Sequence, residues 1–109
     1  MRLFIYGTLL GPGVFGRRGG RMPARSLPAS LPGWRRVALR NSPYPTLRRD
    51  RLATTQGLVV NIGADTARRL AIYEGAKYRL KRVVVQTAKG KTAAWTWIAN
   101  GATTHEWKD

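Results

Sequence analysis

One carboxylate stands out as a candidate acid/base group, Glu74, which is followed by a glycine. The apolar residues before it predict a helix over Thr66–Tyr73 that ends at this point. A carboxylate at a helix C-terminus faces the negative end of the helix dipole, and apolar neighbours remove water from it. Both effects raise the pKa toward the value that a general base needs near neutral pH. An exposed acid that pairs with Lys77 or an arginine is the alternative, and the residues alone leave both open.

The second candidate is the turn Tyr6-Gly7-Thr8-Leu9, which follows the apolar run Leu3–Ile5. A short aromatic and branched run that stops at a glycine predicts a buried strand. Gly7 can adopt backbone angles that other residues avoid and lets a ligand come close. Successive backbone N–H groups in such a turn form a concave site for an anion. A plain strand followed by a tight turn is the alternative interpretation.

The amino-acid composition limits the other kinds of site that the chain can form. A chain of 109 residues is expected to form one domain over 1–109 with a single core. It has no cysteine and one histidine, His105, which excludes a disulfide scaffold and a thiolate metal centre and disfavours a histidine-based one. We therefore expect no metal site. The N-terminal apolar run is too short for a signal peptide or a membrane span, so we expect a cytoplasmic protein without a membrane partner.

The charge of the chain is strongly unbalanced, with 20 Lys and Arg against 5 Asp and Glu and a formal net charge of +15. Such a field attracts anionic partners, namely nucleic acid, a membrane surface or small acidic substrates. The basic residues nevertheless extend from Arg2 to Lys108 without forming a tail. The densest region, Arg17–Arg51, is interrupted by glycine, proline and apolar residues. A solvated basic surface explains this as well as a nucleic-acid site does, so a basic nucleic-acid-binding barrel stays an alternative.

The remaining pattern is rich in strands. Besides the first strand, it predicts an edge strand over Arg25–Leu31, strands over Trp34–Leu39, Gly57–Ile62, Arg79–Thr87 and Thr92–Ile98, and turns at Pro43–Leu47 and Lys89–Lys91. Trp95 and Trp97 share one face of the last strand and indicate core or barrel wall more than a base-stacking platform. The fold class is therefore α+β or mixed α/β around a curled sheet.

The predicted helix has its own signals. Asp65 has the character of an N-cap, and Gly75 that of the residue after a helix C-terminus. Periodicity places Ala67, Leu70, Ala71 and Tyr73 toward the core.

Two segments together resemble a known family. Phe4-Ile-Tyr-Gly-Thr-Leu9 and Glu74-Gly75-Ala-Lys-Tyr78-Arg79, with Tyr44-Pro45 and Gly57-Leu58-Val59 between them, are similar to the gamma-glutamylcyclotransferase-like (AIG2-like) proteins. The resemblance implies a small mixed barrel with one or two short flanking helices. Relatives usually carry an acid three residues before the catalytic glutamate, where this chain has Ala71.

The resemblance also implies a reaction. The α-amine of a small anionic gamma-glutamyl substrate attacks its own γ-amide carbonyl, which gives 5-oxoproline and releases an amine or amino acid. This reaction requires no metal and no cofactor. Glu74 falls on the catalytic acid/base, and Tyr6, Gly7, Thr8, Leu9 and Tyr78 on the substrate-binding positions. Because of Ala71, a catalytically idle member that acts as a binding or regulatory module is the other alternative. The sequence indicates neither the leaving group nor the oligomeric state.

Overall fold

The computed structural model describes residues 1–7, 26–39, 45–99 and 104–106. Their elements, in chain order, are β1 (Arg2–Ile5), β2 (Ser26–Leu39), β3 (Pro45–Asn61), α2 (Ala64–Glu74), β4 (Tyr78–Thr87), β5 (Gly90–Ala99) and β6 (Thr104–Glu106). In this part of the chain, no helix has the length and apolar character needed to cross a membrane.

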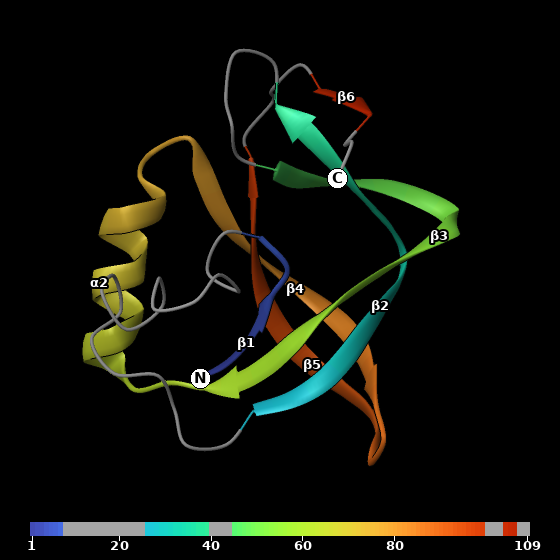
Figure 1. Cartoon of the computed structure of the whole chain (residues 1–109). Helices are drawn as coiled ribbons and strands as arrows, with labels where there is room; N and C mark the ends of the chain where they lie inside the picture. Colours follow the sequence, from blue (N-terminus) through green and yellow to red (C-terminus); the bar gives the residue numbers. More distant parts are fainter. Residues whose placement is uncertain (8–25, 40–44, 100–103, 107–109) are drawn as a thin grey trace.

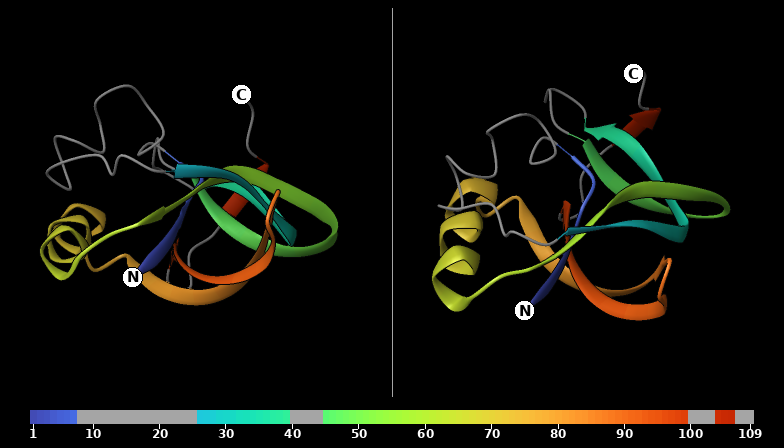
Figure 2. Two further views of the ribbon diagram at one scale, coloured as in Figure 1. Left: turned by 90° about the horizontal axis from the view of Figure 1, so that it is seen from below. Right: turned by 60° about the horizontal axis from the view of Figure 1, so that its bottom comes forward.

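The strands close into a barrel. Strand β1 lies between β3, which is antiparallel to it, and β5, which is parallel to it. Strands β4 and β5 form a hairpin, and β2 closes the ring by pairing with both β3 and β4. The short β6 extends the sheet from the last residues of β2. Figures 1 and 2 show the strands curving around a common axis with α2 on one side. The predicted curled mixed sheet is confirmed.

Strand β1 is buried on both of its faces, as its apolar run predicts. Successive side chains of a strand point to opposite faces. Phe4 therefore joins the cluster inside the barrel, whereas Leu3 and Ile5 join a second cluster with Leu70 of α2. All four side chains are at most 3% exposed. The helix is thus held on the barrel by apolar contacts with β1 and with neighbouring residues of β3.

Strands β2 and β3 differ from the predictions. The edge-strand interpretation of Arg25–Leu31 is wrong, because Ala29 and Ser30 pair with β3 on one side and β4 on the other. The predicted turn at Pro43–Leu47 is also wrong in its second half, since Pro45 begins a strand of 17 residues. Long-range pairing with β2 imposes this strand on an arginine-rich segment that carries little apolar alternation of its own.

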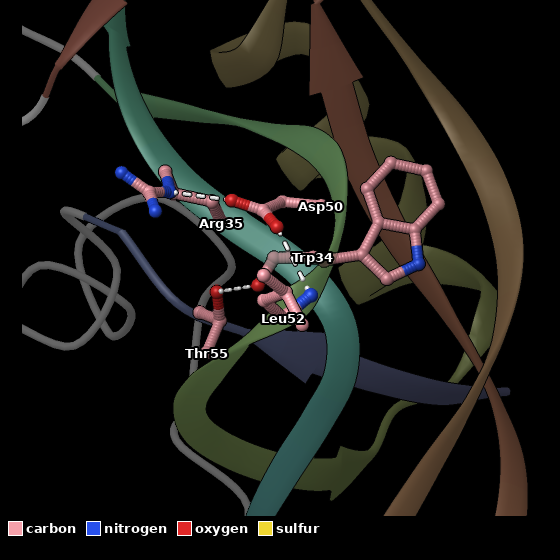
Figure 3. Close-up of polar contacts among 5 residues, drawn as sticks. All are labelled: Trp34, Arg35, Asp50, Leu52 and Thr55. Atoms are coloured by element: carbon pink, nitrogen blue, oxygen red, sulfur yellow. Dashed lines mark hydrogen bonds and ion pairs between the residues drawn. The ribbon is translucent and has the colours of Figure 1, made fainter.

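A bulge interrupts the β2–β3 pairing. Gly33, at φ 84°, stands opposite residues 50–53 of β3. Asp50 fixes this segment because its carboxylate binds Arg35 Nε at 2.9 Å and accepts a hydrogen bond from the Leu52 amide at 3.0 Å (Figure 3). On the other side of the bulge, the Thr55 hydroxyl donates to the Trp34 carbonyl at 2.8 Å. The bend is therefore a defined feature that lets the two strands follow the barrel wall.

Gly57 marks a close approach of β3 to β1. A Cβ atom at this position would lie 2.2 Å from the Ile5 carbonyl oxygen and 2.8 Å from Phe4 Cζ. No side chain fits there without moving the backbone of β1. The ring of Phe4 occupies the space that the glycine leaves.

Helix α2 confirms part of its prediction. Leu70 is fully buried, Ala67 and Tyr73 are partly buried, and Gly75 ends the helix at φ 75° with its amide bound to the Ala71 carbonyl at 3.0 Å. The N-cap prediction for Asp65 is wrong. Gly63 holds that position, and Asp65 lies in the first turn, where it pairs with Arg68 and Arg69.

The placement of Ala71 toward the core is also wrong, because Ala71 is exposed. The β4–β5 hairpin confirms the predicted strands and turn, with two residues, Ala88 and Lys89, between Thr87 and Gly90. Trp95 and Trp97 share one face of β5, as predicted, and this is the outer face of the barrel. Trp97 packs against the cluster under α2, whereas Trp95 is 40% exposed.

Candidate active site

Several elements end at the same mouth of the barrel. Tyr78 of β4 stands opposite Ala99 of β5, and Tyr6 follows β1, which runs parallel to β5. We name this end the Glu74 mouth and define it by Tyr6, Pro45, Thr46, Glu74, Tyr78 and Ala99. In Figure 1 it lies in the upper half, where α2 ends and β4 begins.

Glu74 is the last residue of α2 and is half-buried. Burial raises the pKa of its carboxyl from 4.5 to about 7, because removal from water disfavours the charged form. The sequence-based expectation of a raised pKa therefore agrees with the structure, and burial is its cause. At neutral pH such a carboxyl is present in both protonation states, which is the property of a group that takes up and returns protons.

Tyr6 lies inside the barrel and is 5% exposed. Its hydroxyl donates to the Trp97 carbonyl. Burial first of all raises the pKa of this phenol far above its ordinary value, and the nearby Tyr78 and Glu74 raise it further. Tyr6, Tyr78 and Glu74 are thus close enough to interact electrostatically, although they come from three different elements.

A short turn joins Glu74 to Tyr78. Its first residue, Gly75, closes the helix, and the Tyr78 amide donates to the Gly75 carbonyl at 3.3 Å. The Tyr78 hydroxyl donates to the Pro45 carbonyl at 3.0 Å. The acid and the tyrosine are therefore held together by local backbone geometry, and β3 fixes the orientation of the ring.

Gly7 begins the predicted anion-binding turn. Its φ is not in the left-handed region, so backbone freedom does not account for a glycine here. A Cβ atom would lie 3.3 Å from Pro45 Cγ, and this crowding is the physical reason for a small residue. Thr8 and Leu9, the other predicted residues of the turn, lie outside the described residues, as does Tyr44.

Thr46 of this mouth and Arg36, which contacts the mouth from β2, carry no signal in the sequence. The Thr46 hydroxyl accepts a hydrogen bond from the Ala99 amide at 2.8 Å and also contacts the Tyr6 hydroxyl. Arg36 Nη1 donates to the Tyr6 carbonyl at 3.2 Å, directly before the turn. In the sequence, nothing distinguishes Arg36 from the other arginines of its region, because its contact with Tyr6 forms only in the folded barrel.

The remaining candidates lie elsewhere. His105 belongs to β6, where it pairs with Ala38, and its side chain lies outside the described residues. Among the residues that the structure describes, no three His, Cys, Asp or Glu side chains gather into a metal site. The chemistry of the Glu74 mouth is that of one acid and two phenols.

Sequence and fold comparisons define the class of protein. The family of gamma-glutamyl cyclotransferase, AIG2-like proteins matches residues 3–109, and the chain belongs to this family. No curated protein matches it.

Solved structures share the fold. A protein from Arabidopsis thaliana is 25% identical, with a TM-score of 0.82 over 97% of this chain and 75% of its own. A gamma-glutamyl cyclotransferase is 15% identical, with a TM-score of 0.80 over 95% of this chain and 69% of its own. A protein from Homo sapiens is 17% identical, with a TM-score of 0.78 over 94% of this chain and 68% of its own. The last two likenesses concern the fold alone.

Proposed function

We propose that the protein is a gamma-glutamyl cyclotransferase that releases 5-oxoproline. The substrate carries its own nucleophile, because the α-amine of a gamma-glutamyl group can reach the γ-carbonyl and close a five-membered ring. A new bond forms between the α-nitrogen and the γ-carbon, and the bond from that carbon to the leaving nitrogen breaks. Holding the chain in this reactive shape contributes up to about 7–11 kcal/mol in favourable cases.

Glu74 is the proposed acid/base. The α-ammonium loses two protons as it becomes the lactam nitrogen, and the leaving nitrogen gains two as it becomes an ammonium. A carboxylate beside both nitrogens takes a proton from the first and returns a proton to the second, which contributes about 10²–10⁴-fold. The pKa of about 7 suits both halves of this transfer, since Glu74 accepts and donates with similar ease near neutral pH.

The head group of the substrate is proposed to lie against Tyr6, Gly7, Thr8, Leu9 and Tyr78. Backbone N–H groups of the turn from Gly7 to Leu9 bind the α-carboxylate or the oxyanion that develops on the γ-carbonyl. Tyr6 donates to the Trp97 carbonyl, so its ring forms the floor of the site. Tyr78, at the rim, orients the substrate beside Glu74.

The proposal rests mainly on the environment of Glu74. It is a half-buried acid with a raised pKa, at a barrel mouth that it shares with two tyrosines, in a member of this family. A surface carboxylate used only for solubility would have no reason to be desolvated. The net charge of +15 also favours the approach of a substrate that carries a carboxylate.

Incubation with a panel of gamma-glutamyl amino acids and amines tests the proposal by mass spectrometry. The expected product is 5-oxoproline together with the released amine. N-Acetylated donors are the matched control, because their nitrogen lone pair is tied up in an amide while the carboxylate and γ-amide remain. They should give no product. Release of N-acetylglutamate would instead indicate hydrolysis by water, and no product from any donor would indicate an idle family member.

A further inference from the structure

The opposite mouth of the barrel contains a groove of about 750 Å³. Three cationic side chains line it, Arg2, Lys89 and Lys91, and we name it the basic groove after them. It lies where β1 begins and where the β4–β5 hairpin turns, in the lower part of Figure 1. The mouths of β-barrels are common ligand sites, and volumes of about 300–1,000 Å³ are typical of pockets for small molecules.

Among the described residues, none that lines the basic groove is acidic. The other lining residues are four uncharged polar residues, among them Asn61 and Thr92, together with a glycine and two apolar residues, Leu27 and Val59. Three positive charges without a carboxylate repel one another, and a ligand with several negative charges relieves this repulsion. The apolar pair offers a surface for the uncharged part of such a ligand.

The Arg2 side chain and the backbone that carries the two lysines are held in place before any ligand binds. The Arg2 guanidinium donates to the Thr92 hydroxyl and, at 3.4 Å, to the Ala93 carbonyl. At the hairpin, the Thr87 hydroxyl accepts a hydrogen bond from the Lys89 amide and donates to the Gly90 carbonyl, both at 3.1 Å. The backbone that carries Lys89 and Lys91 is therefore fixed, which lowers the entropy lost on binding.

We propose that the basic groove is a second ligand site, which binds a compact group of two or more linked phosphates. One carboxylate would neutralise only one of the three cations, whereas a phosphate chain carries several charges and many acceptor oxygens. Lysine and arginine are the usual partners of phosphate. The site is separate from the Glu74 mouth, since Arg2 and Tyr6 are about 13 Å apart along β1 at about 3.3 Å per residue. The proposal stands independently of the cyclotransferase activity.

Calorimetric titration with two probes tests the site, inorganic tripolyphosphate and a short single-stranded oligonucleotide. The test variant is Lys89→Gln/Lys91→Gln, and the control is Arg68→Gln/Arg69→Gln, which removes the same charge from the exposed face of α2. Tripolyphosphate should bind with one-to-one stoichiometry. Its affinity should fall at least about tenfold in the test variant, since charge-assisted hydrogen bonds are lost, and stay within about twofold in the control.

The two probes separate the sources of phosphate. If the oligonucleotide alone binds and only the test variant weakens it, the groove takes a nucleic-acid backbone and not a compact group of linked phosphates, which would overturn the proposal; in that case the slope of log affinity against log salt should become shallower by about 1.4 for two lost contacts. Equal losses in the two variants would overturn the proposal, because they would show attraction by net charge alone. Absence of saturable binding to either probe would overturn it as well. Thermal melts establish that both variants fold.

Discussion

The two mouths of the barrel contrast in charge and in exposure. At the Glu74 mouth, an acid is half-buried beside two tyrosines whose hydroxyls bind backbone carbonyls. At the basic groove, three exposed cations surround an open concavity. Burial at the first mouth raises the pKa of Glu74, whereas the cationic side chains at the second are exposed to water. The comparison shows how one small barrel can keep two opposite electrostatic environments.

The distance between the two mouths keeps their electrostatic environments apart. A cation within about 4–6 Å of a carboxylate favours its charged form and lowers its pKa. The lysines of the hairpin and Arg2 lie at the far end of β1 from Tyr6, so they do not counteract the desolvation of Glu74. The apolar cluster inside the barrel lies between the two mouths, from Tyr6 at the first through Phe4 to Val59 at the second.

The largest effect expected at either mouth is that of Glu74→Gln. The amide keeps the shape of the side chain but accepts no proton, so kcat should fall at least about 10²-fold. Steady-state assays of 5-oxoproline release measure this. The matched change at the other mouth, Lys89→Gln/Lys91→Gln, should leave kcat within about twofold. Normal turnover of the Glu74 variant would contradict its catalytic role and leave a purely structural one.

The pH dependence follows from the raised pKa of Glu74. Turnover should rise with pH through about 7, as the base loses its proton. Stability should move the other way, because the folded state holds this proton more tightly than the unfolded state between about pH 4.5 and 7. The free energy of unfolding should therefore fall over that interval, by roughly 1–3 kcal/mol after allowance for the partial exposure of the group.

The variant Glu74→Gln also tests the direction in which the free energy of unfolding changes with pH. Glu74→Gln should be more stable than the native chain at about pH 8 and equal to it at about pH 4, where the native carboxyl is already neutral. Urea unfolding at the two pH values measures the difference. A stability difference independent of pH would show that Glu74 ionises normally in the folded protein.

The same type of substitution, Thr→Val, can be made at each mouth, at Thr46 and at Thr87. Thr46→Val removes a buried acceptor of the Ala99 amide, and an unsatisfied buried donor costs about 1–3 kcal/mol. Because Thr46 also contacts Tyr6, the KM for the gamma-glutamyl donor should rise. Binding of tripolyphosphate should not change. Urea unfolding, steady-state kinetics and calorimetry together test the prediction, and an unchanged free energy of unfolding would mean that water replaces the hydroxyl.

The smallest effect is expected for Thr87→Val at the hairpin. Its two hydrogen bonds to the turn are exposed, so the free energy of unfolding should fall by only about 0.5–1.5 kcal/mol. Loss of the fixed turn should weaken tripolyphosphate binding a few-fold, with kcat unchanged. A loss of stability as large as that of Thr46→Val would show that the two mouths do not differ in burial as described.

The sequence predicted correctly those parts of the fold that are determined by residues close together in the chain. The run Leu3–Ile5 gave a strand, Gly75 gave the end of a helix, and the apolar residues before Glu74 indicated its raised pKa. These features depend on neighbours within a few residues. The family resemblance was carried by the same two segments, and the family match confirms it.

Features that depend on distant pairing were missed. The first half of β3 has few apolar residues and is a strand only because β2 lies beside it. Gly63 displaced Asp65 from the N-cap because the chain leaves β3 in an extended conformation. Thr46 and the basic groove could not be found, since their partners come from opposite ends of the sequence. Arg2 and Lys91 meet only through the parallel pairing of β1 with β5.

Gly57 restricts the register in which β3 can pair with β1. A strand that slips by two residues keeps its apolar face toward the core, so alternation alone does not forbid the error. A slip of β3 along β1 would bring Thr55 or Val59 to the point where Gly57 now lies, and their side chains would collide with the Ile5 carbonyl and the Phe4 ring. Gly57 leaves a gap in β3 that the Phe4 ring of β1 fills, so the two residues fit together sterically in this alignment. They select one alignment among those that hydrophobicity permits, and in doing so they set which residues reach each mouth of the barrel.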